Sequence, residues 1–324
     1  MKTIPSIKIA QLPTPVEYLP RLTAELNGPK ILVKRDDLTG LAFGGNKTRK
    51  LDYLLAEAQG NGARTIITSG AVQSNHCRQT AAACARLNFD CILVLSGDKP
   101  DYATGNLLLD QLFNAKFVWT TPAERDLITQ QTFNNAWAAG ARPYLIPYGG
   151  SNATGATAYV YAIQELLTQG YQPDWIIFAS SSGGTQAGMV AGARLFGLKG
   201  NILGISVDET ETDLQKRVAS LAIETTDMLG ENLTFLPHEI QVNDGYLGGG
   251  YGIMGPPEIE AINMFAKLEG LLLDPVYTGR AAAGLIDLIR KGYFKSDETV
   301  LFWHTGGTPA IFSDKYSSLA NNIY

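Results

Sequence analysis

The sequence is poor in cysteine, in basic charge and in long apolar segments, and each shortage excludes a class of protein. Three cysteines cannot all pair, and their spacing is not that of a metal site. The net charge of -5 argues against broad binding to a phosphate backbone, so we expect no nucleic-acid partner. No apolar run approaches the roughly 18 residues that a membrane-spanning helix needs. Residues 1–19 are interrupted by prolines and lack the apolar core of a signal peptide.

These shortages predict a cytoplasmic protein without structural disulfides, bound metal or membrane contact. Cys77 and Cys84 lie seven residues apart on one helical stripe among alanines, so we expect them to be small core residues rather than nucleophiles. A chain of 324 residues allows one large domain or two smaller ones. No internal repeat or long Pro/Ser linker marks a boundary.

Short apolar runs rich in β-branched residues alternate with helix-period segments along the chain. The predicted strands are residues 30–34, 65–68, 91–95, 116–119, 144–146, 175–179, 202–207 and 299–304. The predicted helices include residues 50–60, 77–87, 154–169, 185–195 and 280–291. This alternation is typical of an α/β protein with open, mostly parallel twisted sheets flanked by helices. A dense turn signal at residues 147–152 is a natural place for the chain to leave one sheet for another.

One lysine, Lys47, directly follows the sequence Gly-Gly-Asn and begins an amphipathic segment. A lysine amine performs covalent chemistry when burial or neighbouring cations lower its pKa. Arg49 and Lys50 are close enough in sequence to disfavour its charged form, and the glycines let the backbone approach a ligand closely. An isolated motif of this kind is more often a solvated helix start. The interpretation of Lys47 as a Schiff-base lysine therefore depends on the remaining motifs.

Two loops after predicted strands carry groups that suit anions. Ser74 and Asn75 precede the helix at residues 77–87, where they either cap the helix or leave its N-terminus open to a substrate carboxylate. The sequence Ser-Gly-Gly-Thr at residues 182–185 is a turn whose N–H groups and hydroxyls suit a phosphate monoester. It matches neither a Walker A motif nor the fingerprint of a nucleotide-binding oxidoreductase. A glycine-rich turn without a ligand is the alternative for this loop taken alone.

The C-terminal part places tyrosine and threonine at the ends of predicted elements. Tyr277 and Thr278 precede the helix at residues 280–291, and Thr305 follows the last strong strand. Tyr251 lies in a glycine-rich stretch able to close over a ligand. Tyr277 is a candidate proton shuttle, and the threonines are candidate hydrogen-bond partners of a cofactor ring. Ordinary turn chemistry, with Thr278 capping the helix, is the alternative.

In this order the motifs resemble those of the D-cysteine desulfhydrase and 1-aminocyclopropane-1-carboxylate (ACC) deaminase family, a fold-type II group of enzymes that use pyridoxal 5'-phosphate (PLP). The matching segments are residues 34–40, 44–50, 73–79, 182–188, 274–279 and 304–307, so the resemblance covers nearly the whole chain. It implies two α/β domains with the active site between them. The larger domain would combine residues 1–49 and 164–324, and the smaller would be residues 50–163. It also implies a homodimer.

The resemblance further implies a role for each candidate residue. Lys47 would hold PLP covalently. The implied phosphate ligands are Ser182, Gly183, Gly184 and Thr185. The residues implied around the cofactor ring are Asn75, Thr278 and Thr305. The implied substrate-binding residues are Ser74, Asn75, His76, Tyr251 and Tyr277. The implied catalytic residues are Lys47, Ser74, Tyr277 and Tyr251.

Two positions favour one branch of the family. Relatives that are ACC deaminases carry glutamate and leucine where this chain has Thr278 and Thr305. A carboxylate beside the ring nitrogen favours a strongly electron-withdrawing ring, whereas a threonine hydroxyl gives a weaker one suited to α-deprotonation and β-elimination. His76, where the deaminases tend to have glutamine, points the same way. We therefore expect a carbon–sulfur lyase that converts D-cysteine, a small amino acid, into pyruvate, sulfide and ammonia.

Three other functions stay open at this point. The resemblance extends to L-cysteate sulfo-lyases, and Arg78 and Arg280 are candidates for recognising a sulfonate. ACC deaminase is the second alternative. A protein that binds or stores PLP without turnover is the non-enzymatic one, and pyruvate release distinguishes it from an enzyme.

Overall fold

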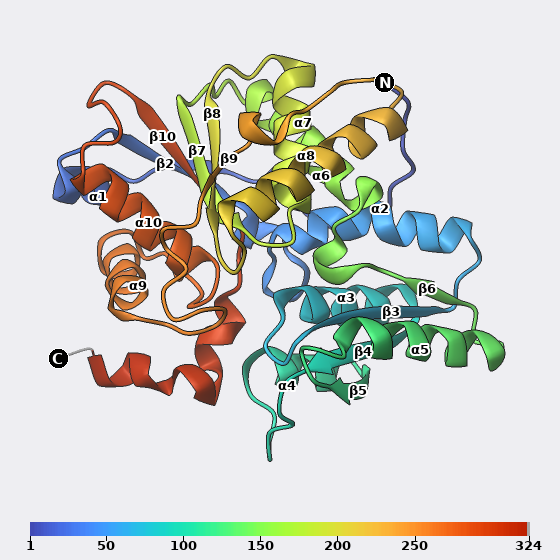
Figure 1. Ribbon diagram of the computed structural model, residues 1–324. Helices are drawn as coiled ribbons and strands as arrows, with labels where there is room; N and C mark the ends of the chain where they lie inside the picture. The colour runs from blue at the N-terminus through green and yellow to red at the C-terminus, as the bar shows by residue number, and fades with distance from the viewer. Residues whose placement is uncertain (323–324) are drawn as a thin grey trace.

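The computed structural model describes residues 1–322 and contains two sheets, each flanked by helices (Figure 1). In spatial order the larger sheet consists of β1 (Val16–Tyr18), β2 (Lys30–Arg35), β10 (Thr299–His304), β7 (Trp175–Ser180), β8 (Asn201–Ser206) and β9 (Gln241–Asn243). The smaller sheet consists of β5 (Lys116–Thr120), β4 (Asp90–Ser96), β3 (Thr65–Ala71) and β6 (Pro143–Leu145). Strand pairing is parallel throughout, except between β1 and β2. The predicted α/β class is confirmed.

Helices connect the parallel strands, as a right-handed crossover requires. They are α1 (Pro20–Leu26), α2 (Asn46–Gly60), α3 (Asn75–Leu87), α4 (Gly105–Leu112), α5 (Arg125–Ala138), α6 (Ala153–Thr168), α7 (Gly184–Phe196), α8 (Glu211–Met228), α9 (Pro256–Glu269) and α10 (Thr278–Arg290). All eight predicted strands are present within one residue of their expected bounds, except that β3 continues three residues further, to Ala71. The two edge strands β1 and β9 were not predicted, because three residues carry too little periodicity to stand out.

The six-stranded sheet is buried on both faces, as its continuous apolar strands require. Phe302 of β10 packs with Phe265 and other residues of α9 and α10 on one face. Phe178 and Trp303 pack with residues of α6 and α7 on the other face. The four-stranded sheet has a separate core, which includes all three cysteines as free, buried thiols. The interpretation of Cys77 and Cys84 as core residues is therefore confirmed.

The two sheets are joined by helices that contact both units and by the N-terminal segment. Leu51, Leu54 and Leu55 of α2 lie in the core of the four-stranded sheet, although α2 begins beside β2. Ile9 packs into the same core, and its N–H donates to the Asp52 carboxylate at 2.9 Å. Helix α6 packs chiefly against α7 and the six-stranded sheet. The domain boundaries at residues 49 and 163 stay a prediction.

A buried carboxylate, that of Asp36, fixes the start of α2 against the larger sheet. It accepts hydrogen bonds from Arg49 at 2.8 and 3.0 Å, from the Tyr159 hydroxyl at 2.6 Å and from the Trp303 indole at 2.8 Å. Burial alone would raise the pKa of Asp36, but the Arg49 guanidinium outweighs it and the pKa is lowered. Asp36 is therefore ionised and fully paired.

A second carboxylate, that of Glu165 on α6, completes this buried network. It accepts from the Lys34 ammonium at 2.6 Å and from Arg49 at 2.9 Å. Thr14 donates its backbone N–H to Glu165 and its hydroxyl to Asp36. The network thus ties the N-terminal segment, β2, α2 and α6 together. We call Lys34, Asp36, Arg49 and Glu165 the paired network below.

In the part of the chain that the structure describes, no helix is both long and apolar enough to cross a membrane. The same residues contain no cluster of three or more His, Cys, Asp or Glu side chains suited to a metal ion.

Candidate active site

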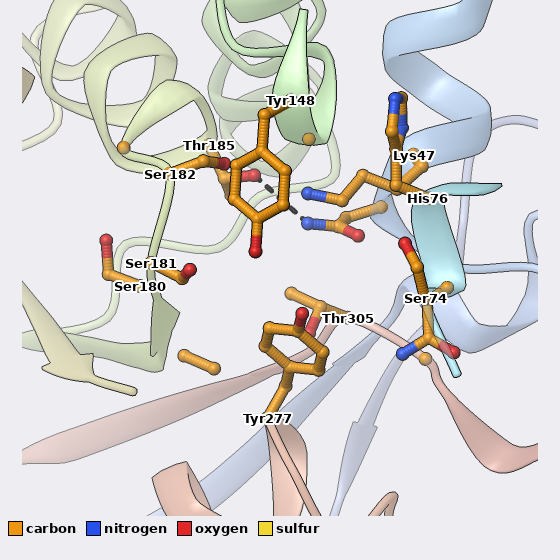
Figure 2. Close-up of a pocket in the computed structure, with 16 residues that line it drawn as sticks. Lys47, Ser74, His76, Tyr148, Ser180, Ser181, Ser182, Thr185, Tyr277 and Thr305 are labelled. Carbon is orange, nitrogen blue, oxygen red and sulfur yellow. Dashed lines mark hydrogen bonds between the residues drawn. The ribbon is translucent and has the colours of Figure 1, made fainter. Parts of the chain in front are cut away.

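A cavity lies between the two sheets, lined by loops that follow their parallel strands and by the first turn of α2 (Figure 2). In open α/β sheets this edge is where ligands bind. The predicted site residues that line it are Lys47, Ser74, Asn75, His76, Ser182, Gly183, Thr185, Tyr277 and Thr305. Gly184, Tyr251 and Thr278 lie just behind this lining. The structure thus brings together motifs that are as much as 258 positions apart in the sequence (305 minus 47).

Lys47 is the second residue of α2, and its amine points into the cavity (Figure 2). Burial lowers its pKa from 10.5 to about 8, although Asp208 acts in the opposite direction. We expected Arg49 to contribute to this shift. Instead, Arg49 points away into the paired network, so desolvation is the main cause. A lysine with this pKa has an appreciable neutral, nucleophilic fraction near pH 7 to 8.

Lys50 lies one helical turn after Lys47 and is fully buried. Its ammonium donates to the Gly149 carbonyl at 3.1 Å and to the Ser151 hydroxyl at 3.3 Å. Burial, followed by the nearby Lys47, lowers its pKa well below the usual value. Among residues 1–322 no carboxylate forms an ion pair with it. A buried cation of this kind is a strong attractor for an anionic ligand.

The glycine-rich loop after β7 meets Lys50 at the N-terminus of α7. The Ser182 and Ser151 hydroxyls lie 2.7 Å apart, and the Gly184 N–H donates to Ser151 at 3.2 Å. A Cβ on Gly184 would lie only 2.9 Å from the Lys50 amine, so glycine is required there. Hydroxyls, a helix N-terminus and an ammonium therefore converge on one small volume. This donor set suits a phosphate group.

Ser74 caps α3 by accepting the Cys77 N–H at 3.2 Å, as predicted for this residue type. The Asn75 side-chain oxygen accepts from Asn106 at 2.9 Å and from Arg78 at 3.4 Å. Because both partners are donors, the Asn75 amide nitrogen is the end left to face the cavity. The start of α3 thus presents a helix N-terminus and an oriented amide donor.

The His76 ring lies between Lys47 and the core of the smaller sheet. Thr68 donates its hydroxyl to the Ile146 carbonyl at 2.9 Å and so accepts from His76 Nε2, also at 2.9 Å. This assigns the proton to Nε2 and leaves Nδ1 as a buried acceptor without a partner in residues 1–322. Burial and the two lysines lower the pKa of His76 well below its ordinary value. The ring is therefore neutral at physiological pH.

Tyr277 lines the cavity, and its hydroxyl lies 2.6 Å from that of Tyr251. Burial raises the pKa of both phenols well above 10. Both are therefore protonated across the physiological range and act as donors rather than bases. The expected pairing of the two tyrosines is present, with Tyr277 toward the cavity and Tyr251 behind it.

The two threonines occupy different environments. Thr305 lines the cavity. Thr278 is fully buried, and its hydroxyl donates to the Asp274 carboxylate at 2.8 Å. Asp274 also accepts the N–H groups of Val276, Tyr277 and Thr278 at 2.7 to 3.0 Å. The cap of α10 is thus Asp274, and the sequence alternative that gave this role to Thr278 is wrong.

Several polar residues singled out in the sequence hold the protein together instead of facing a ligand. Arg78 is buried and donates to the Gly44 carbonyl at 2.8 Å. Arg280 pairs with Glu258 at 2.9 Å and is also buried. Neither arginine lines the cavity. A Cβ on Gly44 would collide with the Asp37 carbonyl, so this glycine is needed for a tight loop and not for approach to a ligand.

Sequence reasoning missed Tyr148, which lines the cavity, and also Lys50 and Ser151, which lie directly behind the lining. Lys50 was considered only for its effect on the pKa of Lys47. Residues three positions apart lie on the same side of a helix, so the two lysines could have been expected to lie close together. Ser151 and Tyr148 belong to the turn at residues 147–152, which was interpreted only as the place where the chain leaves one sheet for another. The contact of this turn with the loop after β7 is a long-range feature that sequence spacing does not encode.

Comparison with known proteins agrees with this geometry. The family model described as "Pyridoxal-phosphate dependent enzyme" matches residues 7–306. A D-cysteine desulfhydrase of Klebsiella pneumoniae (strain 342) is 41% identical over 321 residues, which is 95% of this chain and 96% of that protein. A D-cysteine desulfhydrase of Salmonella choleraesuis (strain SC-B67) is 41% identical over 318 residues, with the same coverage.

Among solved structures, a protein described as an ACC deaminase homologue is 37% identical and superimposes with a TM-score of 0.90, covering 98% of this chain and 96% of the other. A fungal L-serine ammonia-lyase from Rhizomucor miehei shares the fold, with a TM-score of 0.68 at 16% identity. On the extent of these matches, the chain belongs to the pyridoxal-phosphate-dependent enzyme family.

Proposed function

We propose that this protein is a PLP-dependent carbon–sulfur lyase that converts D-cysteine and water into pyruvate, hydrogen sulfide and ammonia. The observation that carries the proposal is the cavity in which the Lys47 amine, with a pKa of about 8, faces the N-terminus of α3 and the Tyr277 hydroxyl. Relatives named D-cysteine desulfhydrases, 41% identical over nearly the full length, support the substrate.

The residues present fit PLP on structural grounds. Lys50 is a buried cation without an acidic partner in the described chain, and an anion beside it would compensate its charge. Its neighbours Ser182, Gly183, Gly184 and Thr185 supply further donors, so we infer that this group holds the phosphate. Two buried polar atoms at the cavity, His76 Nδ1 and Ser180 Oγ, have no protein partner among residues 1–322. Groups of this kind are expected where a polar ligand completes the hydrogen bonding.

On the ring side we infer that the Asn75 amide donates to the phenolic oxygen of PLP. Thr305, which lines the cavity, would hold the side of the ring nitrogen, with Thr278 behind it, where its hydroxyl donates to Asp274. When bound, PLP supplies an electron-accepting ring that stabilises negative charge developing at the substrate α-carbon. A threonine hydroxyl in place of a carboxylate keeps this ring a moderate acceptor. That is sufficient where the leaving group is a sulfur atom on the β-carbon.

The remaining steps follow from the side chains of this chain. The N-terminus of α3, with Ser74 and Asn75, binds the substrate carboxylate. The Lys47 amine, or the neighbouring Ser74 hydroxyl, would accept the α-proton of the substrate. Tyr277 is held protonated by its raised pKa and donates to the departing sulfur, with Tyr251 hydrogen-bonded behind it. The neutral His76 ring adds an acceptor beside these groups.

The alternative substrates fit less well. L-cysteate carries a sulfonate, and the two arginines that could recognise it, Arg78 and Arg280, are engaged in buried contacts away from the cavity. ACC deaminases carry a carboxylate where this chain has Thr278. We therefore infer that elimination from D-cysteine is better supported than either of these two reactions.

We also propose that the protein works as a homodimer in the cytoplasm. Two phenylalanines, Phe43 and Phe312, are 59% and 68% exposed and are therefore accessible to a second copy of the chain. Light scattering of the purified protein tests the assembly. A mass near 70 kDa, about twice the 34.9 kDa of one chain, supports it, and the single-chain mass contradicts it.

The decisive experiment assays the PLP-loaded protein with D-cysteine, L-cysteine, L-cysteate and ACC in parallel. Pyruvate and sulfide from D-cysteine alone are the expected products. Pyruvate and sulfite from L-cysteate would move the assignment to a sulfo-lyase, and 2-oxobutyrate from ACC would show that Thr278 and Thr305 do not decide the reaction. Bound PLP without release of any keto acid would instead favour a storage protein.

A further inference from the structure

A second, larger cavity adjoins the one described above. It has a volume of about 580 Å³ and lies between the loops after β3, β4 and β5 on one side and residues 313–316 on the other. Tyr102 on its rim is 67% exposed, so the cavity communicates with solvent. We call it the outer cavity, and the cavity that contains Lys47 the inner cavity. The inner cavity is far narrower, with about 40 Å³ of free volume.

Among the described residues, Tyr148 is the one whose side chain borders both cavities. Figure 2 shows its ring hanging into the inner cavity, with its hydroxyl directed toward that of Tyr277. The two rings come from different units, because Tyr148 follows β6 of the smaller sheet and Tyr277 precedes α10. The Tyr148 ring therefore stands where the two cavities meet.

The backbone of Tyr148 is firmly held. It begins a tight turn in which the Gly150 N–H donates to the Pro147 carbonyl at 2.8 Å, and Gly149 has a φ of +66°. The Gly149 carbonyl accepts from Lys50 at 3.1 Å. A Cβ on Gly149 would collide with the Ser182 hydroxyl, so the turn packs directly on the loop after β7. Movement of the Tyr148 side chain is thus confined to rotation of its ring.

The outer face of the ring is covered by an arginine. The Arg125 guanidinium lies 4.3 Å from the centre of the Tyr148 ring, within the range of a cation–π contact. Arg125 starts α5 and lines the outer cavity, and its side chain is 27% exposed. The Tyr251 hydroxyl, which belongs to the larger unit and lines the outer cavity, also interacts with Tyr148, although burial is the main influence and raises the pKa of Tyr148. The Tyr148 side chain therefore contacts a cation from the smaller unit and a phenol from the larger one.

We propose that Tyr148, with Arg125 stacked on it, is the gate between the two cavities and a specificity-determining residue for the size of the group on the substrate β-carbon. This inference rests on the proposed function for the identity of the substrate, but the gate itself does not depend on it. A small thiol passes the ring and fits beside it, whereas a bulkier thioether meets the ring. Nothing in the elimination requires the Tyr148 hydroxyl, so the aromatic ring is the part that matters.

The test compares D-cysteine with S-ethyl-D-cysteine, which yields pyruvate, ammonia and ethanethiol by the same elimination. For Tyr148→Ala we expect the ratio of kcat/KM for the thioether to that for D-cysteine to rise about tenfold, a typical value for opening a hydrophobic pocket. Tyr148→Phe keeps the ring, and its ratio should stay within about twofold of the parent. Tyr102→Ala, which changes a tyrosine of the outer cavity alone, is the matched control. An unchanged ratio in Tyr148→Ala, or an equal rise in Tyr148→Phe, overturns the proposal.

A second measurement separates the gate from the identity of the substrate. Hydrazine and phenylhydrazine both react with enzyme-bound PLP and change its absorbance, and they differ mainly in size. In Tyr148→Ala we expect the rate at which phenylhydrazine reacts with bound PLP to rise about tenfold relative to the rate for hydrazine. Arg125→Ala should give a smaller change in the same direction, and Arg125→Lys an intermediate one, because lysine stacks less well.

If Tyr148→Ala does not fold, the Arg125 variants carry the test. If the wild type releases no pyruvate from D-cysteine while the ratio of the phenylhydrazine rate to the hydrazine rate still rises in Tyr148→Ala, the substrate proposal is wrong and the gate proposal is supported. If the ratio of the phenylhydrazine rate to the hydrazine rate is the same in the wild type and in all variants, the gate proposal is wrong.

Discussion

Two pairs of buried basic residues lie within 17 residues of sequence, and they differ in whether carboxylates pair with them. Lys34 and Arg49 belong to the paired network, where two carboxylates meet them at 2.6 to 2.9 Å. Lys47, on the same helix as Arg49, faces the inner cavity, and Lys50, one turn further on, lies behind the cavity lining; neither forms an ion pair in the described chain. Burial lowers the pKa of all three lysines, Lys34 included, whereas the pKa of Arg49 is raised by Asp36 and Glu165 despite its burial.

This contrast separates structural charges from functional ones. A buried pair that is fully hydrogen-bonded locks elements together, and its members keep their charge. A buried cation left without a partner is costly, and it persists where a ligand or a reaction uses it. The same stretch of sequence contains both kinds, and residue type alone does not distinguish them. The distinction depends on whether α2 turns each side chain toward the paired network or toward the cavity.

The strongest test of the contrast is Lys47→Ala. Because it removes the covalent attachment site, we expect pyruvate release from D-cysteine to fall by about a thousandfold or more. The free energy of unfolding in urea should be unchanged or slightly higher, since no ion pair is broken. Borohydride treatment followed by mass spectrometry should find PLP attached to Lys47 in the parent protein and to no residue of the variant. Activity within tenfold of the parent would contradict the assignment.

The matching change in the paired network is Arg49→Met, which leaves two buried carboxylates without their shared partner. We expect a loss of about 3–5 kcal/mol in the free energy of unfolding, measured by urea denaturation of the PLP-free protein. Arg290→Met breaks an exposed pair with Glu260 and should cost no more than about 1 kcal/mol. A loss below 1 kcal/mol for Arg49→Met would mean that the network does not hold the fold.

Removing the other cavity lysine by Lys50→Met should affect cofactor binding selectively. The variant loses one charge-assisted contact to phosphate, so its Kd for PLP should rise about 10- to 100-fold. Binding of pyridoxal, which lacks the phosphate, should change little, and this ligand is the internal control. An equal loss for both ligands would place Lys50 elsewhere than at the phosphate.

The smallest expected effect is on the pH dependence of PLP capture by the PLP-free protein. Lysine reacts when neutral, that is, above its pKa, so the rate should rise with pH and level off just above pH 8. An unperturbed lysine would keep gaining rate to pH 10. Since Asp208 raises the pKa of Lys47, Asp208→Asn should move the midpoint to lower pH. A midpoint near 10.5 in the parent protein would contradict the desolvation of Lys47.

Local signals in the sequence were sufficient for eight of the ten strands in residues 1–322, for the five helices α2, α3, α6, α7 and α10, and for most of the residues that meet at the cavity. Ser74 caps α3 because its type and position demand it, and the loop at residues 182–185 starts α7 as a glycine-rich turn should. The partners of Arg78 and Arg280 were not predictable, because each is set by a residue of another loop or helix. Tyr148 was missed for the same reason: its importance arises where two cavities meet.

The start of α2 has a consequence for how the chain acquires its cofactor. The Asn46 N–H donates to the Thr305 carbonyl at 3.0 Å, and Trp303 donates to Asp36 across 267 positions of sequence. Contacts of such long range form late in folding, because they close a very large loop. A nascent chain that still lacks β10 therefore has Lys47 but not the surroundings that orient it. Binding of PLP thus requires a chain that is fully synthesised and folded. The yellow colour of bound PLP therefore distinguishes complete, folded molecules from incomplete ones.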